Sequence, residues 1–129
     1  MTVLRRVFLT AVALAVAWLS HQPSLEPPFR LFPHQDKVFH FLEFAGLGLA
    51  LHVNRDLKPF FRVGSRFLAG FGWAVLDEIH QHFVPGRFCD PADLLADAAG
   101  LLASLFFCSR LCTHARVRKG HSRAGRSDA

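Results

Sequence analysis

The sequence predicts an all-α membrane protein, a bundle of four transmembrane helices whose N- and C-termini are cytoplasmic. Three observations predict this fold class. Of the 129 residues, 51% are hydrophobic and only 19% are charged, which excludes a disordered chain. The apolar residues form four segments, separated by stretches rich in Pro, Gly or Arg. Lys and Arg residues gather on alternate connections, as they do in membrane proteins of fixed orientation.

The first apolar segment follows two arginines and runs from Val7 to Leu19. A basic start before a short apolar core is also typical of a signal peptide. The end of the run, from Ala17 to His21, lacks the small side chains at alternate positions that signal peptidase requires, so we expect an uncleaved span over about residues 5–20. Residues 22–35 carry four prolines, which exclude a regular helix and predict an extended loop.

Three further spans are expected at about residues 37–54, 65–84 and 92–112, which completes a transmembrane domain over residues 1–112. Each is apolar on all sides at one end and ionic at the other. A soluble four-helix bundle would instead need a polar stripe along the whole of each helix. The remaining residues, 113–129, are basic and poor in apolar side chains, and we expect them to be a disordered cytoplasmic tail.

The distribution of basic residues orients the bundle. Twelve of the fifteen Lys and Arg residues lie in the N-terminus, the central connection or the C-terminal end. The other three, in the two remaining loops, are Arg30, Lys37 and Arg87. The positive-inside rule then puts both termini in the cytoplasm and these two loops outside. The basic residues alternate with apolar stretches and share no single face, so the net charge of +5 does not indicate a nucleic-acid partner.

This orientation gathers polar side chains at the outer ends of three helices. Placing a carboxylate at mid-bilayer raises the free energy of membrane insertion by about 2.5–3.5 kcal/mol, whereas one Leu or Phe lowers it by only about 0.3–0.6 kcal/mol. The acids must therefore lie near the outer interface or face a wet space between helices. Interfacial anchoring and helix capping are the simpler alternative for any one of them. As a set, the residues expected to bind a ligand are Asp36, Lys37, His40, Glu78, Gln81, Arg87, Asp93 and Asp97.

Small residues on the fourth segment predict how closely this helix packs against a neighbour. Ala96, Gly100 and Ser104 are spaced four apart, on one face of a helix. This spacing lets two membrane helices approach closely. We therefore expect a tight contact with a neighbouring helix at this stripe.

Several motifs resemble the VanZ-like family. They are the run from Asp77 to Arg87 (DEIHQHFVPGR), Asp93 six residues later, Gly100 seven after that, and the run from Asp36 to Phe41 (DKVFHF). The resemblance covers about residues 5–112 and implies a small four-span protein of the bacterial cytoplasmic membrane. The family takes its name from a protein linked to resistance to the glycopeptide teicoplanin. Asp97 stands where the family usually has Asn, and Phe44 where Tyr is common.

Three functions are compatible with these residues. The polar ends bind an envelope component, such as a lipid-linked cell-wall precursor or an amphipathic glycopeptide, with Arg87 as a fork for phosphate or carboxylate. Alternatively the protein is an enzyme, with His40 and Glu78 as acid and base, or with a divalent metal on His40, Glu78, His82 and Asp93. Thirdly, it is a structural subunit of a membrane complex. There is no HExxH and no lipid-phosphatase signature, so we favour binding and expect no cofactor.

Overall fold

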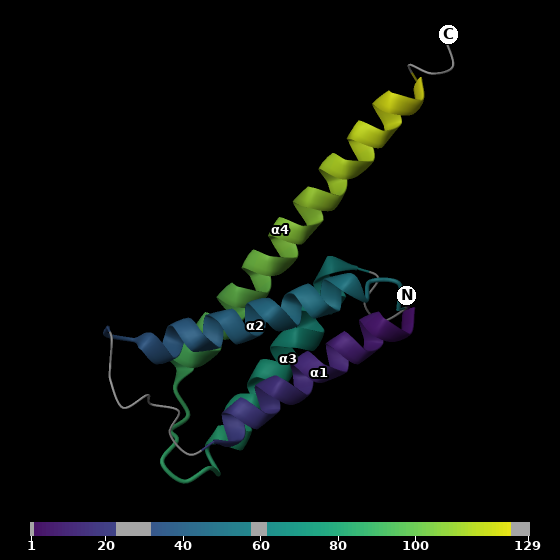
Figure 1. Cartoon of the computed structure of the whole chain (residues 1–129). Coiled ribbons are helices and arrows are strands. Elements are labelled where there is room, and N and C mark those ends of the chain that lie inside the picture. Colours follow the sequence, from purple (N-terminus) through teal and green to yellow (C-terminus); the bar gives the residue numbers. More distant parts are fainter. Residues whose placement is uncertain (1, 23–31, 58–61, 125–129) are drawn as a thin grey trace.

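The computed structural model describes residues 2–22, 32–57 and 62–124, with side chains up to Leu111. These residues form four helices joined by turns and irregular segments, and contain no strand. The all-α class is therefore confirmed. The helices are α1 (Thr2–His21), α2 (Gln35–Val53), α3 (Val63–Gln81) and α4 (Pro91–Ala124), one for each apolar segment (Figure 1).

Two of these helices are long and apolar enough to cross a membrane. They are α1 and the Pro91–Leu111 part of α4. In α2 and α3, three charged residues fall within nineteen, which lowers the apolar character of each helix. The structure therefore supports two candidate spans by length and composition, where the sequence predicts four.

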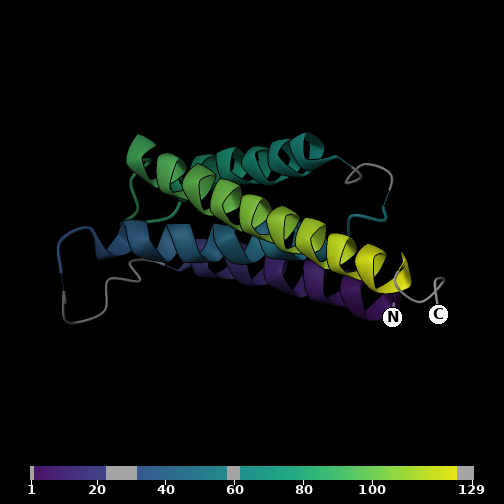
Figure 2. The same cartoon turned by 90° about the horizontal axis from the view of Figure 1, so that it is seen from above.

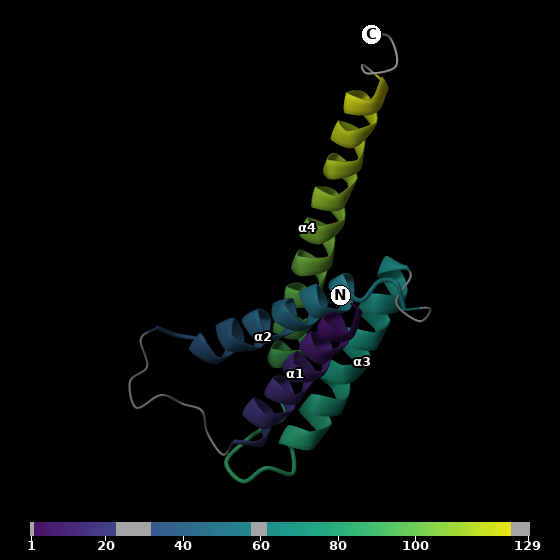
Figure 3. The same cartoon turned by 45° about the vertical axis from the view of Figure 1, so that its right-hand side comes forward.

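The C-terminal part of α4 differs from the sequence prediction. We expect a disordered tail from residue 113, but α4 continues as helix to Ala124. Figure 3 shows this part projecting past the ends of the other three helices. Residues 113–119 contain neither Gly nor Pro, so a helix that has already formed extends through them at little cost. The last expected tail residues, 125–129, lie outside the described residues.

The helices pack around α2. Its contact with α4 is the largest of any helix pair, and Figure 2 shows α4 lying between α2 and α3. Both termini lie on the side away from the loop between α3 and α4 (Figure 2). All four helices contribute to the buried apolar core, which consists of Val16, Phe44, Leu47, Leu51, Ala74 and Leu101.

Glycines bring α4 against α2, as the small-residue spacing predicts. A Cβ atom on Gly100 would collide with the backbone carbonyl of Phe41 and lie 3.0 Å from the backbone nitrogen of Ala45. Further along the same contact, Gly48 faces Ser104. The predicted tight contact is therefore confirmed, and α2 is the partner of α4 in it.

The outer surface of the bundle is apolar on every helix. Large hydrophobic side chains that are more than half exposed occur on all four, among them Leu14, Trp18, Leu42, Leu68, Leu76, Leu95 and Phe107. Polar and charged residues are buried inside instead, including Asp77, Glu78 and Asp97. A soluble protein rarely exposes so much apolar surface.

Candidate functional site

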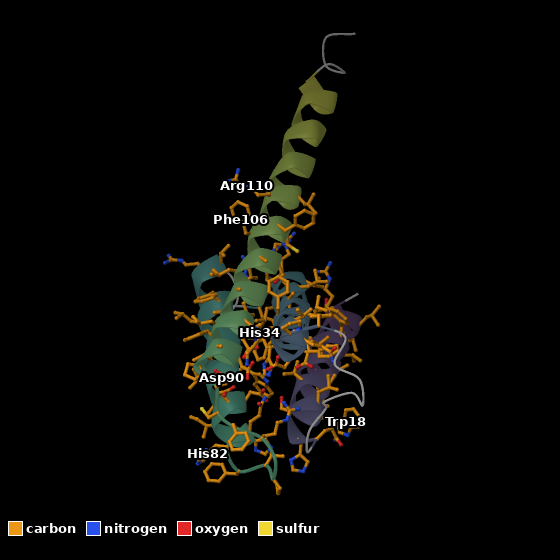
Figure 4. The ribbon with its side chains drawn as sticks, turned by 90° about the vertical axis from the view of Figure 1, so that its left-hand side faces the viewer. Trp18, His34, His82, Asp90, Phe106 and Arg110 are labelled. Carbon is orange, nitrogen blue, oxygen red and sulfur yellow. The ribbon has the colours of Figure 1, made fainter. Side chains whose placement is uncertain are left out.

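Polar side chains from all four helices meet at one end of the bundle. The end of α1, the start of α2, the end of α3 and the start of α4 all lie there, at the lower left of Figure 1. Figure 4 shows Trp18 and His82 at this end, and Phe106 and Arg110 far from it along α4. The residues predicted to form a site are therefore on one side of the molecule. They divide into two groups with different partners.

Lys37 is the centre of the first group. Its Nζ lies 2.5 Å from Oδ2 of Asp90, 2.6 Å from Oδ1 of Asp93 and 3.0 Å from Oδ2 of Asp36. The hydrogen bond to this ammonium lowers the pKa of Asp90. Three carboxylates share one ammonium, so this group remains net negative even though each acid has a cationic neighbour.

His40 continues the group into the interior. Its Nδ1 lies 3.0 Å from Oδ1 of Asp97, and its Nε2 lies 3.9 Å from Oδ1 of Asp93. An ionised Asp97 accepts hydrogen bonds only, so it favours the tautomer with hydrogen on Nδ1. In the neutral ring this leaves the lone pair on Nε2. The second oxygen of Asp97, Oδ2, is buried and has no hydrogen-bond partner in the part of the chain that the structure describes.

Glu78 joins the end of α3 to the segment that precedes α4. Its Oε1 accepts a hydrogen bond of 2.5 Å from the backbone N–H of Asp90. Its Oε2 is buried and, among the described residues, is not hydrogen-bonded. Asp93 and His40 are among its electrostatic neighbours. Glu78 therefore belongs to the same acidic cluster, which we define as Asp36, Lys37, His40, Glu78, Asp90, Asp93 and Asp97.

Exposure falls steadily along this acidic cluster. The side chain of Asp36 is 60% exposed and that of Lys37 21%, whereas those of Asp93 and Asp97 are 10% and 1% exposed. Each of these side chains is linked to the next through Lys37 or His40. The cluster thus forms a continuous polar path from the loop surface to the buried carboxylate of Asp97.

The second group joins α1 to α3. The hydroxyl of Ser20 donates to Oδ2 of Asp77 over 2.6 Å, and Nε2 of Gln81 donates to the same oxygen over 3.0 Å. All three residues are buried. Gln81, predicted as a ligand-binding residue, therefore bonds to Asp77 within α3, while the bond between Ser20 and Asp77 joins α1 to α3.

Arg87 lies at the end of α1 and not against the acidic cluster. Its Nε donates to the carbonyl of Gln22 and its Nη2 to the carbonyl of Leu19, both over 3.2 Å. The last carbonyls of a helix have no partner within the helix, so the guanidinium caps α1. Gly86, at φ 81°, makes the turn that precedes it. These two bonds occupy donors that we expected to form a fork for an anion.

The metal set considered from the sequence is not assembled. His82 is exposed, and its ring packs edge-on against Phe83 at 5.5 Å between centroids. Across the residues that the structure describes, no three or more His, Cys, Asp or Glu side chains are arranged to hold a metal ion. The proposed ligands His40, Glu78 and Asp93 stay together in the acidic cluster without His82.

Sequence reasoning missed Asp90 and the partner of Asp77. Asp90 precedes Pro91, and its Oδ1 accepts from the N–H of Ala92 over 2.9 Å, which makes it the N-cap of α4. The Asp-Pro pair is a signal of such a cap and was available in the sequence. Nothing in the spacing of Ser20 and Asp77, which are 57 residues apart, indicates that they touch.

No curated protein and no solved structure matches this chain. A family model described as VanZ/LLP1 matches residues 4–112, which include the polar end of all four helices and the whole acidic cluster. This match, with the two helices able to cross a membrane, suggests a membrane protein. The resemblance noted in the motifs is thereby confirmed. The chain belongs to the VanZ/LLP1 family.

Proposed function

We propose that the chain is a four-span protein of the bacterial cytoplasmic membrane, with both termini in the cytoplasm and the acidic cluster at the outer surface. The apolar exterior of all four helices supports this, because lipid is the solvent in which such a surface is stable. The three charges of α3 that disqualify it as an isolated span are buried, and two of the three in α2, Lys37 and Glu43, are partly buried. Partly buried and paired charges cost much less in a bundle than on a lone helix.

The acidic cluster is the proposed binding site, and its ligand carries hydroxyl or ammonium groups. The observation that carries this is a pair of buried carboxylate oxygens without a hydrogen-bond partner in the described chain. One is on Asp97, where the path from Asp36 ends, and the other is on Glu78, which accepts from the N–H of Asp90 through its other oxygen. Leaving a buried acceptor unsatisfied costs about 1–3 kcal/mol. Ionised carboxylates only accept hydrogen bonds, so a ligand that donates them recovers this cost.

The charge of the cluster also bears on the ligand class. Five carboxylates face one ammonium and one imidazole, and the guanidinium of Arg87 caps α1 instead of facing them. An anionic group would be repelled here. Lipid-linked cell-wall precursors and amphipathic glycopeptides both present sugar hydroxyls and amines, and we propose an envelope component of this kind. By this route the protein would affect susceptibility to teicoplanin-type glycopeptides.

Glu78→Gln tests the proposal. The amide oxygen can still accept from the N–H of Asp90, while the NH₂ group replaces the unpartnered acceptor with a donor. We expect the dissociation constant of teicoplanin, or of a polyprenyl-linked cell-wall precursor, to rise about 10- to 150-fold, the range for a hydrogen bond to a charged group. The measurement is titration of the protein in nanodiscs. Asp56→Asn, an exposed carboxyl after the end of α2, is the matched control.

Two outcomes of this titration would contradict the proposed binding site. If neither probe binds the wild-type protein, or if Asp56→Asn weakens binding as much as Glu78→Gln, the acidic cluster is not the site. A map of reporter fusions at Arg30, Lys58 and the C-terminal end tests the topology separately. A reporter at Lys58 that is active only outside the cell would overturn the proposed orientation.

The contact between His40 and Asp97 favours one second candidate, an acid–base enzyme acting on a lipid-linked envelope precursor. Asp97 fixes the imidazole so that Nε2 is free to accept a proton, as a general base must. This candidate predicts that the wild-type protein changes the mass of the precursor on incubation and that His40→Ala abolishes the change. Binding alone predicts that the precursor is recovered unaltered, as mass spectrometry would show.

A further inference from the structure

Two histidines at the polar end of the bundle belong to neither group of side chains described above. His21 is the last residue of α1, and His80 lies in the last turn of α3. Nδ1 of His21 lies 3.2 Å from Nε2 of His80, and the centroids of their rings are 5.4 Å apart. Both residues are exposed, at the end of the molecule that Trp18 and His82 mark in Figure 4. Two helices thus bring two imidazole nitrogens together at the surface, and we call His21 and His80 the histidine pair.

Neighbouring bonds hold the helix ends that carry the histidine pair. Ser20, which precedes His21, donates to the carboxyl group of Asp77, one turn before His80. Arg87 donates to two carbonyls at the end of α1, on either side of His21. These bonds keep the end of α1 beside the end of α3 whether or not the imidazoles touch. A ligand of the pair therefore finds its two partners already close together, which lowers the free energy needed to order them.

The separation of the two nitrogens matches that of two ligands on one metal ion. Imidazole nitrogens bind Zn²⁺ at about 2.0–2.1 Å, so two of them on one tetrahedral ion are separated by roughly 3.3–3.4 Å. The nitrogens of the histidine pair are 3.2 Å apart. A neutral imidazole carries its hydrogen on either nitrogen, so both rings can present a lone pair at the facing atoms. Since both side chains are exposed, the rings can turn toward a shared ion without displacing packed atoms.

We propose that the histidine pair binds a divalent transition metal ion, of the class of Zn²⁺, Ni²⁺ and Cu²⁺, and that this ion fastens the end of α1 to the end of α3. Imidazole is a favoured ligand of these ions, whereas Mg²⁺ and Ca²⁺ take oxygen ligands. In the described part of the chain no third His, Cys, Asp or Glu side chain is arranged with the pair to hold an ion, so water fills the remaining positions. The pair shares no residue with the acidic cluster, and the proposal does not depend on what that cluster binds.

Metal titration of the full chain, purified without a histidine tag and kept in a neutral detergent, tests this. The probes are Ni²⁺ and Zn²⁺, with Mg²⁺ in a separate arm, and isothermal titration calorimetry gives the dissociation constants. We expect saturable binding of Ni²⁺ and Zn²⁺. His21→Gln and His80→Gln should each raise the dissociation constant at least about tenfold, because even the outer-shell partner of a metal ligand is worth that much. The two variants change different helices, so either one serves if the other fails to fold.

His82→Gln is the matched control, since it removes an exposed imidazole beside the end of α3 that packs on Phe83 instead of on the histidine pair. Weaker binding in the pair variants but not in His82→Gln supports the site. Equal weakening in His82→Gln overturns it. Wild-type protein that binds neither Ni²⁺ nor Zn²⁺ at millimolar concentration would show that the pair is a hydrogen bond only, and also overturns it.

Two further measurements separate this site from the acidic cluster and examine the fastening of the helices. Glu78→Gln should leave the binding of Ni²⁺ and Zn²⁺ unchanged, whereas loss there and not in the pair variants would assign the ion to the acidic cluster and contradict the proposal. An ion bound only by the folded protein stabilises it, so Zn²⁺ should raise the Tm of wild type but not of His21→Gln. A wild-type Tm that Zn²⁺ leaves unchanged in spite of binding would show that the ion does not fasten α1 to α3.

Discussion

Gly100→Ala should destabilise the bundle although Ala is the better helix former. In a helix, Ala in place of Gly gains about 0.5–1 kcal/mol. At Gly100 the new Cβ would collide with the carbonyl of Phe41 and lie 3.0 Å from the nitrogen of Ala45. These are main-chain atoms of α2, so they cannot rotate away, and the overpacking cost of about 1–3 kcal/mol should lie near its upper end. We expect a net loss of about 1–2 kcal/mol in the free energy of unfolding.

The same substitution at open glycines provides the control. Nothing lies within 4 Å of a Cβ built on Gly46 or Gly72, so Ala there should be neutral or slightly stabilising. At Gly48 the nearest atom is the rotatable hydroxyl of Ser104, and the effect should be intermediate. Thermal unfolding in detergent, followed by tryptophan fluorescence, should give a Tm roughly 4–8 °C lower for Gly100→Ala. A Gly100→Ala protein as stable as Gly46→Ala would refute the close approach of α2 and α4.

Two further variants examine the acidic cluster. Asp97→Ala should cost about 1–3 kcal/mol because it leaves the Nδ1–H of the buried His40 without an acceptor, whereas Asp97→Asn keeps an acceptor and should cost less. Chemical or thermal unfolding measures both losses, and equal losses would contradict the pairing. Asp90→Asn removes the ion pair with Lys37 but keeps the N-cap of α4. The hydrogen bond to Lys37 lowers the pKa of Asp90 from its ordinary value of 3.8. The ion pair therefore stabilises the fold above pH 3.8, and this stabilisation is lost as the pH falls below that value. The Tm values of wild type and Asp90→Asn should thus differ at pH 7 and converge in acid. A constant difference in Tm down to acid pH would show that the pair does not act through the Asp90 charge.

The sequence predicts which ends of the helices are polar, and the structure brings those ends together. This follows from helical periodicity, which fixes the face on which Asp36, His40 and Asp97 lie. The sequence also predicts the tight contact at Gly100, because a small residue at every fourth position leaves one face of the helix without large side chains. Neither pattern names the partner helix. That choice depends on how all four helices pack.

Loop conformation is the part of the fold that the sequence predicts least. The direction of Arg87 depends on the turn at Gly86, and it determines whether the guanidinium meets the acids or the end of α1. The hydrogen bond between Ser20 and Asp77 joins residues that no spacing rule relates. The extension of α4 was missed for a different reason. Its composition is that of a solvated tail, but the helix that precedes it supplies the nucleus that the isolated segment lacks.

The cap on α1 has a consequence for biosynthesis. The carbonyl of Leu19 accepts locally from the N–H of Gln22 over 3.1 Å, but its second donor, the guanidinium of Arg87, is 68 residues further along the chain. At about 5–20 residues per second, a ribosome makes that stretch in roughly 3–14 s. In the proposed topology, α1 has by then reached the translocation channel or the adjoining bilayer without its guanidinium cap. The bonds of α1 to Asn54 and Asp77 can form earlier, but a chain released before Arg87 lacks the cap at the end of α1.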